Sequence, residues 1–189
     1  GLLKMCSTQD VRFAEGMIDE GRGLANKLFN ATRLILLNAD PDAHPAPNGH
    51  AAADRWILDR LAATIDEVTA QYEAFAFSAA TKTLYAFIWN EFCDWYLEAI
   101  KARLYGDDAA SKRAASETAL FVIERILGIL HPIAPFVTEE LWAFLPDRDG
   151  LLARAAFPTA DGIPRDADAA ATVGAIIEAV TGLRRLRQD

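Results

Sequence analysis

The residues closest to a catalytic arrangement are three carboxylates, Glu91, Asp94 and Glu98. Spacings of three and four residues place them on one face of a predicted helix. In a four-helix bundle such a row could bind two metal ions, but that site also needs Glu-x-x-His pairs from two helices, and the sequence contains none. Buried carboxylates without partners are rare. We therefore favour ion pairs with Lys101, Arg103 or the arginines of a neighbouring helix over a carboxylate-metal enzyme.

A second group of residues has the side chains that single-stranded RNA requires. Lys27, Asn30 and Arg33 recur every three residues along a predicted helix, and Phe29 lies beside them. A cation neutralises phosphate, an amide reads a base edge, and an aromatic ring stacks on an unpaired base. A further basic strip near the end of the sequence consists of Arg184, Arg185 and Arg187. On the residues alone, both strips are more simply interpreted as solvated helix faces.

The other reactive residues do not form a recognisable active site. His44 and His50 lie in or beside a proline-rich loop, and His131 is interpreted as a packing or capping histidine. Cys6 and Cys93 are far apart and belong to no CxxC or Cys/His cluster. We therefore predict neither a disulfide framework nor a zinc site, and no Ser/His/Asp or Cys/His arrangement can be assigned.

Composition predicts an acidic, folded chain. Apolar residues make up 52% of the 189 residues, which is enough for a sizeable core, and the net charge is −8. Bulk charge therefore excludes general attraction to nucleic acid, so any RNA contact must come from a local basic strip. The longest apolar runs are too short to span a bilayer, and we expect no signal peptide. Because the first residue is Gly1, we expect a piece of a longer protein.

Apolar residues recur with helical periodicity along most of the chain. The predicted helices span about residues 11–38, 51–73, 78–104, 109–130, 135–145 and 168–187. Prolines exclude regular structure at 40–49, and residues 151–158 are predicted to be extended. The helix at 78–104 carries aromatic residues on more than one face, which places it at the centre of a bundle. We predict an all-α fold, a helical bundle of four to five main helices with a C-terminal helical extension.

Several stretches of the sequence match motifs of a known family. They are residues 10–13 followed by 26–33, then 53–61, 75–98 and 131–142, with Phe157-Pro158 after them. On these motifs the chain resembles the anticodon-binding domain of class I aminoacyl-tRNA synthetases. The string Trp-Asn-Glu-Phe-Cys-Asp-Trp-Tyr-Leu-Glu at 89–98 is similar to the valine-specific branch of the class. The resemblance covers nearly the whole chain.

The chain also departs from that family. The catalytic signatures His-Ile-Gly-His and Lys-Met-Ser-Lys-Ser are absent, as are the nucleotide fold, the editing domain and the C-terminal coiled-coil arm. Phe29 stands where the family commonly has tryptophan, which keeps a ring but removes an N–H donor. The resemblance thus implies a parent valine–tRNA ligase that uses ATP, with ATP and Mg in its catalytic domain. We expect this chain alone to be inactive and to hold no cofactor.

The resemblance changes the interpretation of the basic strips, because in this family the bundle receives the anticodon stem-loop. It implies that Lys27 and Arg33 contact phosphate or bases, that Asn30 reads a base edge and that Phe29 stacks or packs. Arg184, Arg185 and Arg187 are the remaining tRNA-binding candidates.

The resemblance also implies the partners and the division of the chain. The expected partners are the anticodon arm of valine-specific tRNA and the rest of the synthetase chain, in the cytoplasm, with no membrane or DNA partner. Residues 1–10 are expected to be a remnant of the junction to the catalytic body and 11–146 the anticodon-binding bundle. Residues 147–189 are expected to lead toward the missing arm. The alternative is a helical protein-interaction domain that kept the fold but not RNA binding.

Overall fold

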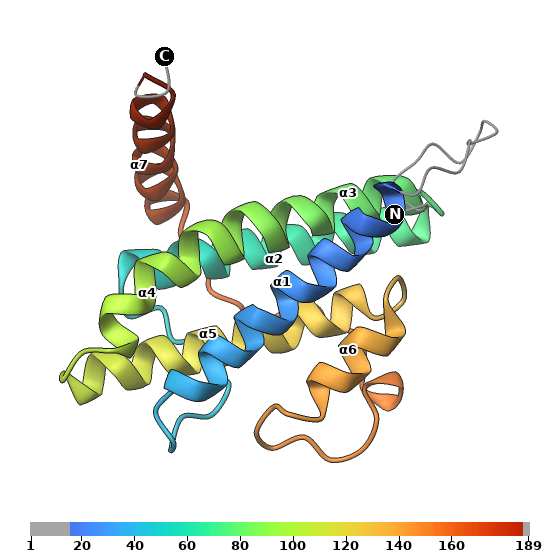
Figure 1. Cartoon of the computed structure of the whole chain (residues 1–189), viewed down its shortest axis with the longest axis horizontal. Coiled ribbons are helices and arrows are strands. Elements are labelled where there is room, and N and C mark those ends of the chain that lie inside the picture. The colour runs from blue at the N-terminus through green and yellow to red at the C-terminus, as the bar shows by residue number, and fades with distance from the viewer. Residues whose placement is uncertain (1–15, 187–189) are drawn as a thin grey trace.

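The computed structural model describes residues 16–186, and all regular structure within that range is helical (Figure 1). The all-α prediction is therefore confirmed. The elements are α1 (Gly16–Asn38), α2 (Ala52–Glu73), α3 (Phe77–Ala86), η2 (Phe87–Tyr96), α4 (Leu97–Leu104), α5 (Ala109–Leu130), α6 (Pro135–Trp142), η3 (Leu152–Arg154) and α7 (Ala167–Leu186). Among the sequence motifs, residues 10–13 lie outside the described range, as do the first residues of the helix predicted from 11 and the proposed junction at 1–10.

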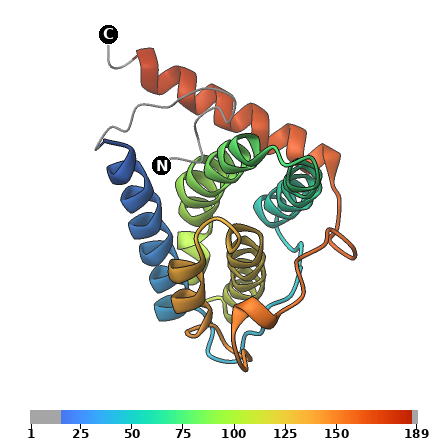
Figure 2. The same cartoon turned by 90° about the vertical axis from the view of Figure 1, so that its right-hand side faces the viewer.

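α3, η2 and α4 follow one another without a break and form one long helix at the centre of the bundle. Seen along its length, this helix is surrounded by α1, α2 and α5 (Figure 2). α6 packs on α5 and α1, and α7 packs on α2. α7 stands at a steep angle to the other helices (Figure 1), and Ala169 is its one buried residue.

The middle of the long helix, η2, is a π-helix of ten residues. The sequence predicts ordinary α-helix here, because helical periodicity does not distinguish the two. Hydrogen bonds from i to i+5 bring residues five apart onto neighbouring turns, and Phe87 and Phe92 are both buried. Together with Tyr96 they are the largest fully buried side chains of the core. The aromatic residues that identified this helix as central therefore do fill the centre of the bundle.

The segment after α6 corrects two predictions. α6 ends at Trp142 and not at 145, because the N–H groups of Phe144 and Leu145 donate to carbonyls three residues back (3.2 and 3.1 Å), which tightens the chain into a turn. The extended segment predicted at 151–158 is wrong at Leu152–Arg154, which form a 3-10 turn. The carboxylate of Glu139 holds this turn by accepting the N–H groups of Leu152 (2.7 Å) and Ala153 (3.2 Å).

Candidate nucleic-acid interface

The three carboxylates of the long helix each pair with a different cation. Glu91 accepts hydrogen bonds from Nε and Nη2 of Arg60 on α2 (2.7 and 3.1 Å), and Glu98 pairs with Lys101 one turn along (2.5 Å). Asp94 pairs with a residue of α1, as described next. Within residues 16–186, no group of three or more His, Cys, Asp or Glu side chains could hold a metal ion. The expected ion pairs with Lys101 and with an arginine of a neighbouring helix are thus present.

Lys27, the first cation of the candidate strip on α1, is held against the long helix. Its ammonium group pairs with the carboxylate of Asp94 and lies 3.9 Å from the centroid of the Trp89 ring. A cation over an aromatic face and beside a carboxylate is attracted by both. The side chain is only 23% exposed. Lys27 therefore fastens α1 to η2.

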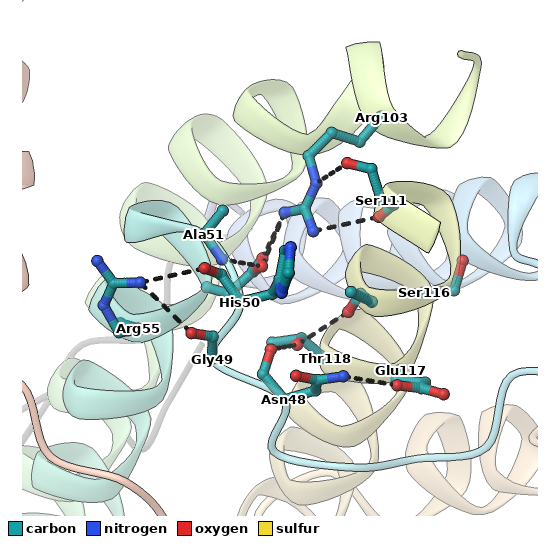
Figure 3. A network of polar contacts seen from close by, with 12 residues as sticks. Asn48, Gly49, His50, Ala51, Arg55, Arg103, Ser111, Ser116, Glu117 and Thr118 are labelled. Atoms are coloured by element: carbon teal, nitrogen blue, oxygen red, sulfur yellow. Dashed lines mark hydrogen bonds and ion pairs between the residues drawn. The ribbon is translucent and has the colours of Figure 1, made fainter. Parts of the chain in front are cut away.

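Arg103 does not pair with the carboxylate row but with Asp54, which corrects that part of the ion-pair prediction. Nη1 of Arg103 donates to both oxygens of Asp54 (2.9 and 2.7 Å). Nε of Arg103 donates to Oγ of Ser111 (3.0 Å) (Figure 3). Asp54 is fully buried and also accepts the Tyr96 hydroxyl (3.0 Å) and the N–H of Ala51 (3.0 Å). We call Asp54, Tyr96, Arg103 and Ser111 the buried network. It joins the start of α2, the end of η2, α4 and α5.

The chemistry of the buried network is structural. Burial, and then the neighbouring charge of Asp54, raise the pKa of Tyr96 well above its ordinary value, so the phenol remains a hydrogen-bond donor. The acceptor positions of Asp54 are occupied by protein donors, which is what a buried carboxylate requires. The loop before α2 is attached next to this network, since Thr118 donates to the carbonyl of Asn48 (2.8 Å) (Figure 3).

The other residues of the strip on α1 face solvent. Phe29 is 45% exposed, and Asn30 and Arg33 are also exposed. Neither Asn30 nor Arg33 forms a hydrogen bond or an ion pair within the described part of the chain. Lys27 therefore lies on a different side of α1 from Asn30 and Arg33, because it faces η2.

A shallow apolar pocket of about 210 Å³ adjoins this exposed side of α1. Its lining comes from α1 and from the region of α6: Phe29, Thr32, Arg33, Leu36, Leu37, Leu141 and Phe144. The ring of Phe144 is 55% exposed. We call Phe29, Asn30, Arg33 and Phe144 the α1–α6 face. Two open rings, an amide and an unpaired guanidinium are the groups that stack on bases, read their edges and bind phosphate.

The sequence did not identify the contribution of α6 to this face. Phe144 follows the motif at 131–142 by two residues, and nothing in its spacing connects it to Phe29, which lies more than a hundred residues earlier. The one available signal was an aromatic residue in the last turn of the helix predicted at 135–145. Packing of α6 against α1 brings the two rings to the same pocket.

The C-terminal basic strip lies elsewhere. The guanidinium of Arg184 lies 5.2 Å from the centroid of the Trp95 ring and lines a groove of about 520 Å³ with Trp56, Asp94 and Val173. Arg185 is exposed, and Arg187 lies outside the described residues. This groove runs between α7 and the start of α2, so the described arginines of the strip are not part of the α1–α6 face.

The remaining candidates have local partners. His131 shares a hydrogen bond between its Nδ1 and Oγ1 of Thr138 (2.8 Å), as expected for a packing histidine, and His44 contacts Asp147 (2.5 Å). Burial raises the pKa of the Cys93 thiol to about 12. None of the described helices is long and apolar enough to cross a membrane.

Comparison with known proteins relates this arrangement to tRNA ligases. The family model described as the anticodon-binding domain of tRNA ligase matches residues 54–189. The valine–tRNA ligases of Lactiplantibacillus plantarum and Latilactobacillus sakei subsp. sakei are 40% and 37% identical to this chain over 184 and 185 residues. One from Bacillus cereus is 36% identical over 184 residues. These matches cover 96% of this chain and 21% of each relative, so the chain spans about a fifth of their length.

A solved structure shares the fold. The agnB2 LeuRS of Agrobacterium radiobacter K84, crystallised in a ternary complex with tRNA and LeuAMS, superimposes with a TM-score of 0.62 at 19% sequence identity. The match covers 85% of this chain and 19% of that one.

Proposed function

This chain belongs to the family of anticodon-binding domains of tRNA ligases, and from that membership we propose that it recognises the anticodon arm of valine-specific tRNA. The parent in this proposal is a longer valine–tRNA ligase, in line with the relatives that this chain resembles. Attachment of valine with ATP and Mg belongs to parts of the parent outside these residues. We place the parent in the cytoplasm.

The observation that carries the proposal is the α1–α6 face. It combines two exposed rings with an amide and a guanidinium that no described residue engages. Unstacked bases of an RNA loop bind by stacking on such rings, and the cation fixes the backbone. In this proposal Phe29 and Phe144 stack, Asn30 reads a base edge and Arg33 binds phosphate.

Lys27 and the C-terminal arginines take different roles in the proposal. Lys27 holds α1 in place through Asp94 and Trp89, so it supports the α1–α6 face from behind and contacts RNA only if it leaves these partners. Arg184, Arg185 and Arg187 form a second, separate contact to the backbone of the tRNA. The net charge of −8 repels phosphate that is not guided by these few cations, which favours one register of binding.

The test is binding of this chain to a valine-tRNA anticodon stem-loop and to a stem-loop with a substituted anticodon, each at two salt concentrations. We expect preference for the native anticodon and weaker binding of Arg33→Ala. The matched control is Arg113→Ala, which removes the same charge from an exposed arginine that pairs with Glu117 on α5 and should leave the affinity unchanged. Equal affinity for both stem-loops, or equal loss in both variants, contradicts the proposal.

A further inference from the structure

The turn between α2 and α3 contains a residue that its backbone disfavours. The N–H of Ala76 donates to the carbonyl of Gln71 (2.8 Å) and the N–H of Phe75 to the carbonyl of Tyr72 (3.0 Å). This pair of bonds is the Schellman motif, which puts the residue after the C-cap into the left-handed region, where glycine is usual. Here that residue is Phe75, with a φ of 56°. A phenylalanine is strained where glycine or asparagine is not.

Packing of the Phe75 ring within the fold does little to offset this strain. The ring is 76% exposed, and within residues 16–186 its one ring contact is with the edge of Phe77, with ring centroids 6.1 Å apart. Phe77 in turn contacts Tyr72, and Tyr72 contacts Phe157, at centroid distances of 6.3 and 6.1 Å. We call these four residues the turn patch. A contiguous aromatic surface of this kind marks an interaction site, and the strain at Phe75 indicates that its ring is placed for a contact outside the described residues.

The charges beside the turn patch indicate the chemistry of the partner. Phe157 also lines a groove of about 340 Å³ beside α2, whose charged lining residues are Asp66, Glu73 and Asp161. Asp66 pairs with Arg165 (2.5 Å), whereas Glu73 and Asp161 form no ion pair within residues 16–186. Carboxylates repel phosphate, so this surface disfavours RNA. It is complementary to a protein segment with apolar and basic side chains.

The turn patch lies at the end of the bundle where α1 begins. Glu20 and Leu24 of α1 line one pocket together with Thr81 of α3, one turn after Phe77, and Figure 1 shows the α2–α3 turn beside the start of α1. The relatives extend well beyond the fifth of their length that this chain matches. We propose that the turn patch is the surface on which the bundle docks against the remainder of its parent tRNA ligase. This inference rests on the proposed function, because it takes the chain to be part of such a ligase.

The test is Phe75→Asn in two contexts, since asparagine adopts the left-handed conformation readily. In the 189-residue chain we expect the Tm to rise by about 2 °C through loss of strain, with no change in stem-loop affinity. In the full-length parent we expect the Tm to fall. We also expect kcat/KM for tRNA charging to fall about fivefold, because aromatic anchors carry much of the energy of an interface. The control is Tyr105→Asn in the turn after α4, a ring that is 58% exposed and should leave charging unchanged.

Three outcomes overturn the inference. An equal rise in Tm in the parent and in this chain means that Phe75 is strained without an interface. Loss of stem-loop affinity in the isolated variant means that the patch contacts RNA. A concentration-dependent dimer of this chain that Phe75→Asn dissociates means that the occupant is a second copy. The Tm comparison needs no RNA, so a wild-type chain that binds no stem-loop contradicts the proposed function and leaves this test intact.

Discussion

Two arginines show how differently this bundle uses its cations. Arg103 belongs to the buried network, where it donates to Asp54 and to Ser111. Arg33 lies on the α1–α6 face and has no partner within the described residues. Ionised groups in a core must be saturated, because an unpaired charge there costs several kcal/mol. A cation without a carboxylate partner is therefore available to a ligand, whereas a cation paired with a carboxylate, such as Lys27, holds the helices together.

Loss of Arg103 from the buried network should destabilise the bundle more than loss of Arg33 from the surface. Arg103→Met removes one partner and leaves the charge of Asp54 buried, so the free energy of unfolding should fall by about 3–5 kcal/mol. Arg33→Met removes the same charge from the surface and should change stability by no more than about 0.5 kcal/mol. Urea denaturation of both variants measures the difference. Equal stability of the two variants means that the buried network does not support the bundle.

An apolar contact between α5 and the segment before α7 tests how closely the interior of the bundle is packed. A Cβ added at Gly128 on α5 would lie 2.4 Å from Cγ of Pro158, so Gly128→Ala should cost about 1–3 kcal/mol through overpacking. Gly174→Ala on α7 meets no atom within 4 Å and should instead stabilise the helix by about 0.5–1 kcal/mol. Thermal unfolding measures both. If the two substitutions shift Tm in the same direction, the close packing of the segment before α7 on α5 is wrong.

Substitutions on the α1–α6 face should weaken stem-loop binding and leave the stability of the fold nearly unchanged. Phe144→Ala removes a ring that is already half exposed, so the fold should lose little. Stem-loop binding should weaken by about 1–3 kcal/mol, the usual value of one stacked base. Phe136→Ala is the matched control, because that ring on α6 is 91% exposed and does not line the pocket. Titration of a fluorescent stem-loop measures the affinities. An equal loss of affinity in Phe144→Ala and Phe136→Ala would mean that RNA does not bind at this pocket.

The smallest expected change in stability is at alkaline pH and involves Tyr72. Burial raises the pKa of Tyr72 to about 12, and its hydroxyl donates to the carbonyl of Ile129 (3.0 Å). A raised pKa contributes stability that is complete below pH 10 and is lost as the pH rises from 10 through about 12. Tyr72→Phe should therefore make the alkaline loss of stability shallower. Unfolding curves between pH 8 and 12 measure it, with Tyr105→Phe as the exposed control; parallel curves for wild type and Tyr72→Phe contradict this reading.

The sequence predicted the helices far better than their partners. Helical periodicity located α5 at its true bounds and α2 within one residue, since apolar spacing depends only on local geometry. The partner of Asp94 proved to be Lys27, 67 residues away, and that of Arg103 proved to be Asp54, 49 residues away. Which of several nearby cations a carboxylate meets depends on how helices cross. The sequence did not show that Phe29 and Phe144 line one pocket, for the same reason.

The distinction between engaged and free cations is tested most directly by the salt dependence of stem-loop binding. Each phosphate contact contributes about −0.7 to the slope of log affinity against log salt for single strands. We predict that Arg33→Met makes the slope shallower by about 0.7, whereas Lys27→Met lowers affinity without changing the slope. Equal changes of slope in both variants would show that Lys27 leaves Asp94 to bind phosphate. That result would contradict the account in which Lys27 holds α1 in place and Arg33 contacts the RNA.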